Sequence, residues 1–131
     1  MANQATIFFN SKHEGVLHAK EHQAQISYKG HGFAPYELLL GGLASCLHAT
    51  FLGISTKKRL QFESVNYEVY ATKREEVPTL LNNVKITITF TGVLENKQDA
   101  MIKSMQMAEN YCSISVMIKG IATMEFEYIF N

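Results

Sequence analysis

Apolar and polar residues alternate most clearly between residues 84 and 91. Every second position there is apolar: Val84, Ile86, Ile88 and Phe90. A period of two is typical of a strand that buries one face. The same alternation predicts a strand near Val65–Val69 and a final strand over residues 121–130. Three β-prone runs near the start predict three further short strands: residues 5–9, 15–19 and 24–28.

Two longer segments show a helical period instead. Between Tyr36 and Lys57, one stripe is aliphatic and a second consists of small residues: Gly42, Cys46, Ala49 and Gly53. The uncharged part of this segment is about long enough to cross a bilayer. Its glycine and hydroxyl residues disfavour insertion, so we interpret it as a central helix buried on nearly all sides. A second helix is predicted from Asn96, a candidate N-cap, to Cys112.

The order β-β-β-α-β-β-α-β predicts a single α+β domain over residues 1–131, with helices on one face of an antiparallel sheet. Its composition, 47% apolar and 18% charged, suits one packed domain. Twelve basic and twelve acidic residues balance to zero net charge, which argues against a nucleic-acid or anionic-membrane partner. No basic-then-apolar leader follows Met1, so we expect a cytoplasmic protein.

The two cysteines are the strongest candidates for chemistry. Two cysteines cannot form the disulfide framework of a small secreted scaffold. Cys46 and Cys112 each lie on the small or apolar stripe of a predicted helix, so packing of the helices can bring them together. Spacing alone leaves two interpretations open, namely buried inert thiols or a reactive pair. The histidines lack metal-ligand spacing with the cysteines, and we expect no metal site.

Two segments together resemble the OsmC/Ohr family of peroxide-detoxifying proteins. The first is Phe33-Ala-Pro-Tyr-Glu-Leu-Leu-Leu-Gly-Gly-Leu-Ala-Ser-Cys46, and the second is Ala108-Glu-Asn-Tyr-Cys112-Ser-Ile-Ser. The resemblance implies an intertwined homodimer with central helices packed between two antiparallel sheets. It also implies a cysteine-based peroxidase that reduces organic hydroperoxides in the oxidative stress response, with no membrane or nucleic-acid partner.

In that reading, Cys46 is the peroxidatic cysteine and Cys112 the resolving one. A thiolate attacks the peroxide and becomes a sulfenate, which the second thiol converts into a disulfide. An external dithiol reductant then restores both thiols, and no cofactor is expected. The alternative is a binding or redox-sensing protein of the same fold, with a hydrophobic dimer pocket and no efficient peroxidase activity.

The chain departs from the family pattern around Cys46. Characterised branches supply an arginine from the N-terminal strands, but residues 1–30 contain none, which leaves Lys12 and His13 as candidates. The family glutamate lies ten residues before the cysteine, where this chain has Tyr36. Glu37 is nine residues before, on the opposite side of a regular helix at about 100° per residue.

His48 follows Cys46 by two residues and points about 200° away from it on a helix. We therefore expect His48 to be packed or to face a dimer partner rather than to serve the cysteine.

Overall fold

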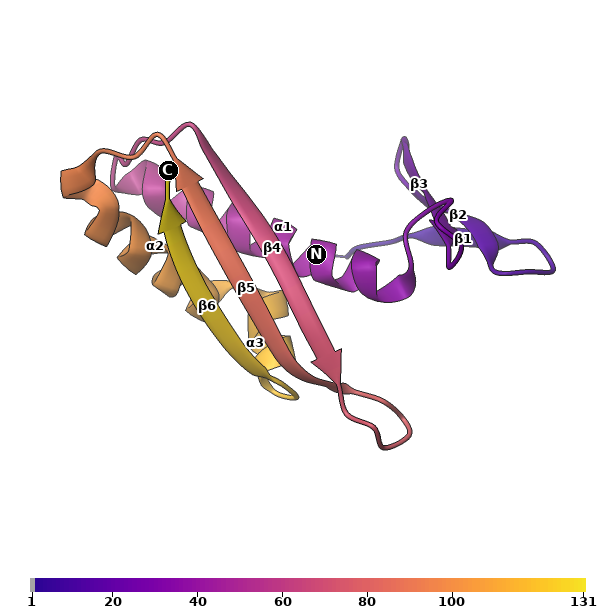
Figure 1. The fold of residues 1–131 in the computed structure, drawn as a ribbon. Coiled ribbons are helices and arrows are strands. Elements are labelled where there is room, and N and C mark those ends of the chain that lie inside the picture. Colours follow the sequence, from indigo (N-terminus) through magenta and orange to yellow (C-terminus); the bar gives the residue numbers. More distant parts are fainter. Residues whose placement is uncertain (1) are drawn as a thin grey trace. The chain divides into compact units, whose positions relative to one another are not determined.

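The computed structural model describes residues 2–131, which form six strands and three α-helices (Figure 1). Three strands are followed by a long helix, two strands, two helices and a last strand. This α+β order matches the prediction, except that the second helical segment is divided in two. The chain forms two compact units, of which the first ends at Leu40 and the second begins at Gly41. The single domain expected over residues 1–131 remains a prediction.

The first unit is built on an antiparallel sheet in the order β1-β2-β3. Its strands are Thr6–Phe9, Glu14–Ala19 and His22–Ser27. The loop after β3 returns to the sheet, where the Phe33 amide donates to the Gln25 carbonyl over 2.7 Å. Gly32 lies against the Gln25 backbone so closely that a Cβ atom would clash there. The glycine therefore allows the loop to close before the long helix begins.

The second unit contains a sheet in the order β4-β5-β6, with strands Ser64–Lys73, Leu81–Thr91 and Thr123–Phe130. The β4 and β5 strands are antiparallel, as predicted, but β5 and β6 are parallel. The expectation of purely antiparallel sheets is therefore wrong for this pair. The helices between β5 and β6 carry the chain back to the end of the sheet where β5 began, and such a crossover makes the next strand parallel.

The helices are α1 (Pro35–Lys57), α2 (Gln98–Tyr111) and α3 (Ser113–Lys119), with a 3₁₀ turn at Glu95–Lys97 before α2. The predicted N-cap was wrong, since Asn96 lies inside the 3₁₀ turn and Lys97 precedes α2 without a side-chain cap. The predicted helix end near Cys112 is where α2 stops. The sequence analysis missed α3, which starts at the next residue.

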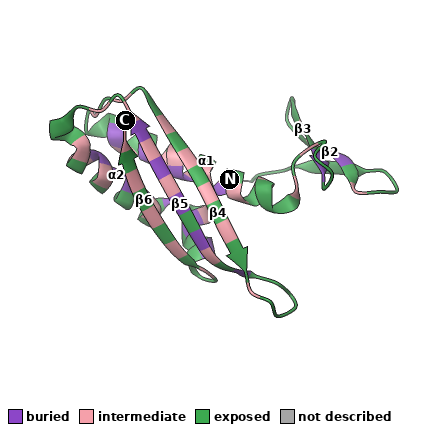
Figure 2. Ribbon diagram, in the orientation of Figure 1, coloured by how far each residue is buried: buried purple, intermediate pink, exposed green. Residues whose placement is uncertain are grey.

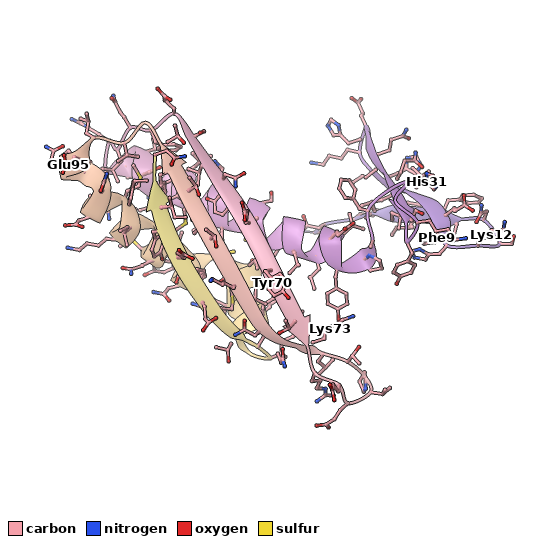
Figure 3. All side chains as sticks on the ribbon, in the orientation of Figure 1. Phe9, Lys12, His31, Tyr70, Lys73 and Glu95 are labelled. Atoms are coloured by element: carbon pink, nitrogen blue, oxygen red, sulfur yellow. The ribbon has the colours of Figure 1, made fainter. Side chains whose placement is uncertain are left out.

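The core of the second unit lies between the sheet and its helices. Figure 2 shows buried positions alternating along β5 in the centre of the sheet. From α1, Leu43, Leu47 and Phe51 are fully buried, and they pack with Met101 and Met105 of α2 in one cluster. The opposite face of the sheet is exposed, as Tyr70 of β4 illustrates at 69% (Figure 3).

Within one chain, α1 is not buried on nearly all sides, contrary to the expectation. Leu52 is 41% exposed, and a Cβ atom added at Gly42 or Gly53 would meet no atom within 4 Å. In residues 2–131, α1 is the one helix long and apolar enough to cross a membrane, a test that core helices of soluble proteins also pass. Its small, apolar outer face is therefore available for packing against another element.

Candidate active site

Cys46 of α1 and Cys112 after α2 lie in contact within the second unit. Their Sγ atoms are 2.7 Å apart, and both cysteines are free thiols. Cys112 belongs to the core and is only 1% exposed, whereas Cys46 is half-buried at its edge. A disulfide bond is about 2.05 Å long, so a small movement is sufficient to join the two sulfurs. The predicted proximity of the cysteines is therefore confirmed.

Cys112 occupies the break between α2 and α3, and this break orients its side chain. Its amide still donates to Ala108 as part of α2, but its ψ of 115° is extended and ends that helix. Its carbonyl then accepts from Val116, and its sulfur accepts from the Ser115 amide over 3.4 Å. The Cys112 side chain thus caps α3 while it contacts Cys46.

The pKa of Cys46 lies below the ordinary value of a thiol. Burial of Cys46 raises its pKa, but hydrogen bonds lower it by more in total. The largest of these comes from the Cys112 thiol, followed by the Ile114 amide and then the side chain and amide of Ser113. A thiolate is the nucleophilic form of cysteine, so these donors favour the reactive state of Cys46.

The Cys112 thiol is shifted in the opposite direction. Burial raises the pKa of Cys112 to about 11, helped by its hydrogen bond to Cys46 and by the Cys46 charge, and opposed by the Ser115 and Ile114 amides. Cys112 therefore keeps its proton at neutral pH and donates it toward Cys46. The pKa values of the two thiols are therefore shifted in opposite directions, and Cys112 is the thiol that stays neutral.

The other predicted site residues, Lys12, His13, Tyr36 and Glu37, belong to the first unit. The Glu37 carboxylate accepts a hydrogen bond from the Ala34 amide over 2.9 Å, which caps the start of α1. Tyr36 is partly exposed in the same helical turn. Neither observation gives these residues a role in chemistry.

Lys12 and His13 lie in the β1–β2 turn, as the sequence suggested. The Lys12 amide donates to the Asn10 side chain over 2.8 Å (Lys12 is labelled in Figure 3). The His13 ring lies between Phe9 and Tyr28, with centroid distances of 5.1 and 4.2 Å. Its buried Nδ1 atom has no hydrogen-bond partner among the described residues. The ring of His13 thus belongs to an aromatic cluster with Phe9 and Tyr28.

His48 is packed, as expected, and contacts the sheet. Its Nδ1 atom lies 2.9 Å from the Tyr67 hydroxyl, and the two rings meet edge to face. Burial lowers the pKa of His48, which favours the neutral ring. His48 therefore joins α1 to β4 as a neutral hydrogen-bonding partner.

A groove of about 380 Å³ is lined by residues of α1 and α2 and by the residue after α1, with a mostly apolar surface. Its lining residues are Thr50, Ile54, Lys57, Lys58, Met107 and Tyr111. Thr50 follows Cys46 by one helical turn and donates to its carbonyl, and Tyr111 precedes Cys112. In residues 2–131, no group of three or more His, Cys, Asp or Glu side chains is placed to hold a metal ion.

The family model described as OsmC-like protein matches residues 28–127 of this chain. The chain belongs to the OsmC-like family. The match spans both cysteines and the segments on which the resemblance was based, so that identification is confirmed. No curated protein sequence matches the chain.

Solved structures of this family share the fold at low sequence identity. An OsmC-like protein from Mycoplasma pneumoniae has a TM-score of 0.86 at 14% identity, covering 99% of this chain and 97% of the other. An organic hydroperoxide resistance protein OsmC from Legionella pneumophila, also named a predicted redox protein, has a TM-score of 0.73 at 14% identity, covering 98% and 97%. The hydroperoxide resistance protein OhrB of Bacillus subtilis has a TM-score of 0.67 at 13% identity, covering 95% and 97%.

Sequence reasoning missed the donors around Cys46. It sought a cation to replace the family arginine, whereas hydrogen bonds from residues 112–114 lower the Cys46 pKa. A usable signal was present in the serines that follow Cys112 and in the four-residue spacing of Ile114 and Ile118. Serine often begins a helix, and that spacing gives a short helix one apolar face.

Proposed function

We propose that this protein is a thiol-dependent peroxidase that reduces organic hydroperoxides. The observation that carries the proposal is the pair of sulfurs 2.7 Å apart whose pKa values are shifted in opposite directions. A peroxidatic cysteine needs to be an anion, while a resolving cysteine needs only to be close. Cys46 and Cys112 suit these two roles in that order.

The proposed reaction begins with attack of the Cys46 thiolate on one peroxide oxygen. The O–O bond breaks, the alcohol leaves after taking up a proton, and Cys46 becomes a sulfenic acid. The Cys112 sulfur then attacks the Cys46 sulfur, and water leaves as the disulfide forms. An external dithiol reduces the disulfide by exchange. These steps require the two thiols, the peroxide and the dithiol, and no bound cofactor.

The relatives support this substrate class, since two of them are named organic hydroperoxide resistance proteins. We place the activity in the cytoplasm, where thiols stay reduced. The proposed assembly is a homodimer, supported by the open outer face of α1 around Gly42, Leu52 and Gly53. Small residues on a helix allow a second backbone to approach closely, so this face suits helix packing.

A second candidate function is supported by the groove lined by residues of α1 and α2. A binding or redox-sensing protein would hold a small apolar molecule against Ile54, Met107 and Tyr111, with no efficient turnover of peroxide. In that case the thiol pair would report oxidation by forming a disulfide. The two candidates differ in whether the purified protein consumes peroxide repeatedly.

The test is an assay of purified protein with an organic hydroperoxide and a dithiol. We expect many equivalents of peroxide to be consumed by the wild type and none above background by Cys46→Ser. In the absence of the dithiol, Cys112→Ser should reduce one equivalent of peroxide and accumulate sulfenic acid on Cys46. If the wild type consumes a single equivalent and stops despite excess dithiol, the sensing function is favoured. If Cys46→Ser keeps wild-type turnover, the peroxidase proposal is wrong.

A further inference from the structure

A hydrogen bond joins the last turn of α2 to the sheet just before Cys112. The Tyr128 hydroxyl of β6 donates to a carboxylate oxygen of Glu109. Glu109 precedes Cys112 by three residues, and the Cys112 amide still donates to Ala108 within the α2 pattern. Residues three apart on a helix lie on the same face, with Cβ atoms about 5–6 Å apart. The link is thus one helical turn away from the Cys112 side chain.

The partly buried surroundings of Glu109 favour its hydrogen bond to Tyr128. Glu109 and Tyr128 are both half-buried. Burial raises the pKa of Glu109, while the Tyr128 hydroxyl and the Lys119 charge oppose that rise. A carboxylate held partly away from water depends on its donors, because an unsatisfied buried charge is costly. Glu109 is therefore held toward β6.

We infer that the Glu109–Tyr128 hydrogen bond positions the Cys112 thiol against Cys46 for disulfide formation. The backbone turns at Cys112 into an extended conformation, so the helix pattern does not continue through this residue. The hydrogen bond from Tyr128 to Glu109 attaches the last turn of α2 to the sheet. It thereby fixes the position of the Cys112 sulfur relative to the Cys46 sulfur on α1.

The inference rests on the proposed function for its biological purpose, but its chemistry can be measured separately. Disulfide closure from the sulfenic acid joins the two sulfurs, while the Cys112 proton and the Cys46 hydroxyl leave as water. The same disulfide forms when oxidised glutathione accepts two electrons and two protons from the thiols and is released as two reduced glutathione molecules. The equilibrium constant of that exchange reports how well the folded chain holds the thiols together, with no peroxide involved.

The experiment measures this equilibrium constant for the full-length protein in glutathione buffers, by counting thiols. We expect Tyr128→Phe to lower it by about tenfold, the size of effect that follows from losing one hydrogen bond to a charged group. Glu109→Ala should lower it similarly. Glu109→Gln retains an oxygen that can accept from Tyr128 and should stay closer to the wild type. A near-wild-type equilibrium constant in Glu109→Gln would show that the hydrogen-bond acceptor at residue 109, rather than its charge, positions Cys112.

The matched control is Tyr67→Phe, which removes a tyrosine hydrogen bond to His48 on the same core-facing side of the sheet. We expect this control to lose thermal stability much as Tyr128→Phe does and to keep the wild-type equilibrium constant. An unchanged constant in Tyr128→Phe, or an equal loss in Tyr67→Phe, would overturn the inference. A tenfold lower equilibrium constant in Tyr128→Phe, but not in Tyr67→Phe, supports the inference. This result would support it even if the wild type failed to turn over peroxide. Failure of the peroxidase proposal is therefore distinguishable from failure of this inference.

Discussion

The Cys112 thiol donates a hydrogen bond to the Cys46 sulfur over 2.7 Å. This bond lowers the pKa of its acceptor and raises that of its donor, because it stabilises an anion on Cys46 and is lost when Cys112 ionises. Each thiol therefore determines the reactivity of the other.

Alkylation of Cys46 should have its midpoint at a lower pH than that of an ordinary exposed thiol, because hydrogen bonds lower the pKa of Cys46. Lowering the pH through the Cys46 pKa protonates the thiolate and slows the reaction. Cys112→Ala removes the strongest donor and should move the midpoint to higher pH. The measurement is the iodoacetamide rate as a function of pH, with modified residues assigned by mass spectrometry. In Cys46→Ser, the buried Cys112 should react only in alkaline solution, and rapid labelling at pH 7 would contradict its assigned state.

Ser113→Ala should slow alkylation of Cys46 at pH 7 by about fivefold, because it removes one hydrogen bond to the thiolate, equivalent to about 1 kcal/mol. The amides of Ser113 and Ile114 remain as donors, so the loss is partial. Ser115→Ala is the comparison, since its hydroxyl donates to the Met124 sulfur and its amide, which donates to Cys112, is retained. An equal alkylation rate in Ser113→Ala and wild type would show that the Ser113 side chain does not stabilise the Cys46 thiolate.

The pH dependence of Cys46 alkylation also tests the candidates in the first unit. The variants are Lys12→Ala, His13→Ala and Tyr36→Phe. A higher alkylation midpoint in one of these variants would show that the first unit also stabilises the thiolate.

Gly42→Leu should dissociate the proposed homodimer. The new side chain has open space within one chain, so folding of the monomer should be unaffected, whereas close packing of α1 against a partner would be blocked. Light scattering at micromolar concentration checks the mass, and circular dichroism checks the fold. Asn110→Leu places the same side chain on an exposed position of α2 as a control. A wild type that is strictly monomeric would refute the homodimer proposal.

Glu109→Gln should gain stability relative to the wild type as the pH rises. The pKa of Glu109 is raised in the folded protein, so the folded state binds a proton more tightly than the unfolded state does. The wild type therefore loses stability as the pH rises from about 4.3, the ordinary glutamate pKa, to the folded value. Thermal unfolding at several pH values tests this, because the variant lacks the titration. A stability difference that is the same from pH 4 to 8 would contradict the raised pKa.

The strands and the long helix were predictable because periodicity reports which faces of an element are buried. Alternation along residues 84–90 corresponds to β5, and the span from Tyr36 to Lys57 differs from α1 by one residue. Periodicity does not report which strand pairs with which. The parallel pairing of β5 with β6 follows from the crossover through α2 and α3, which is a long-range property.

The sequence by itself determined the cysteines, the helical stripes that carry them and the family to which they point. Side-chain identity and spacing are sufficient for these, because a helix places every third or fourth residue on one face. Tertiary structure alone decided that the α2 pattern breaks at Cys112, which brings donors from residues 112–114 to the Cys46 sulfur. Hydrogen bonds act over about 3 Å, so the acidity of Cys46 depends on where separate segments meet in space rather than on their order along the chain.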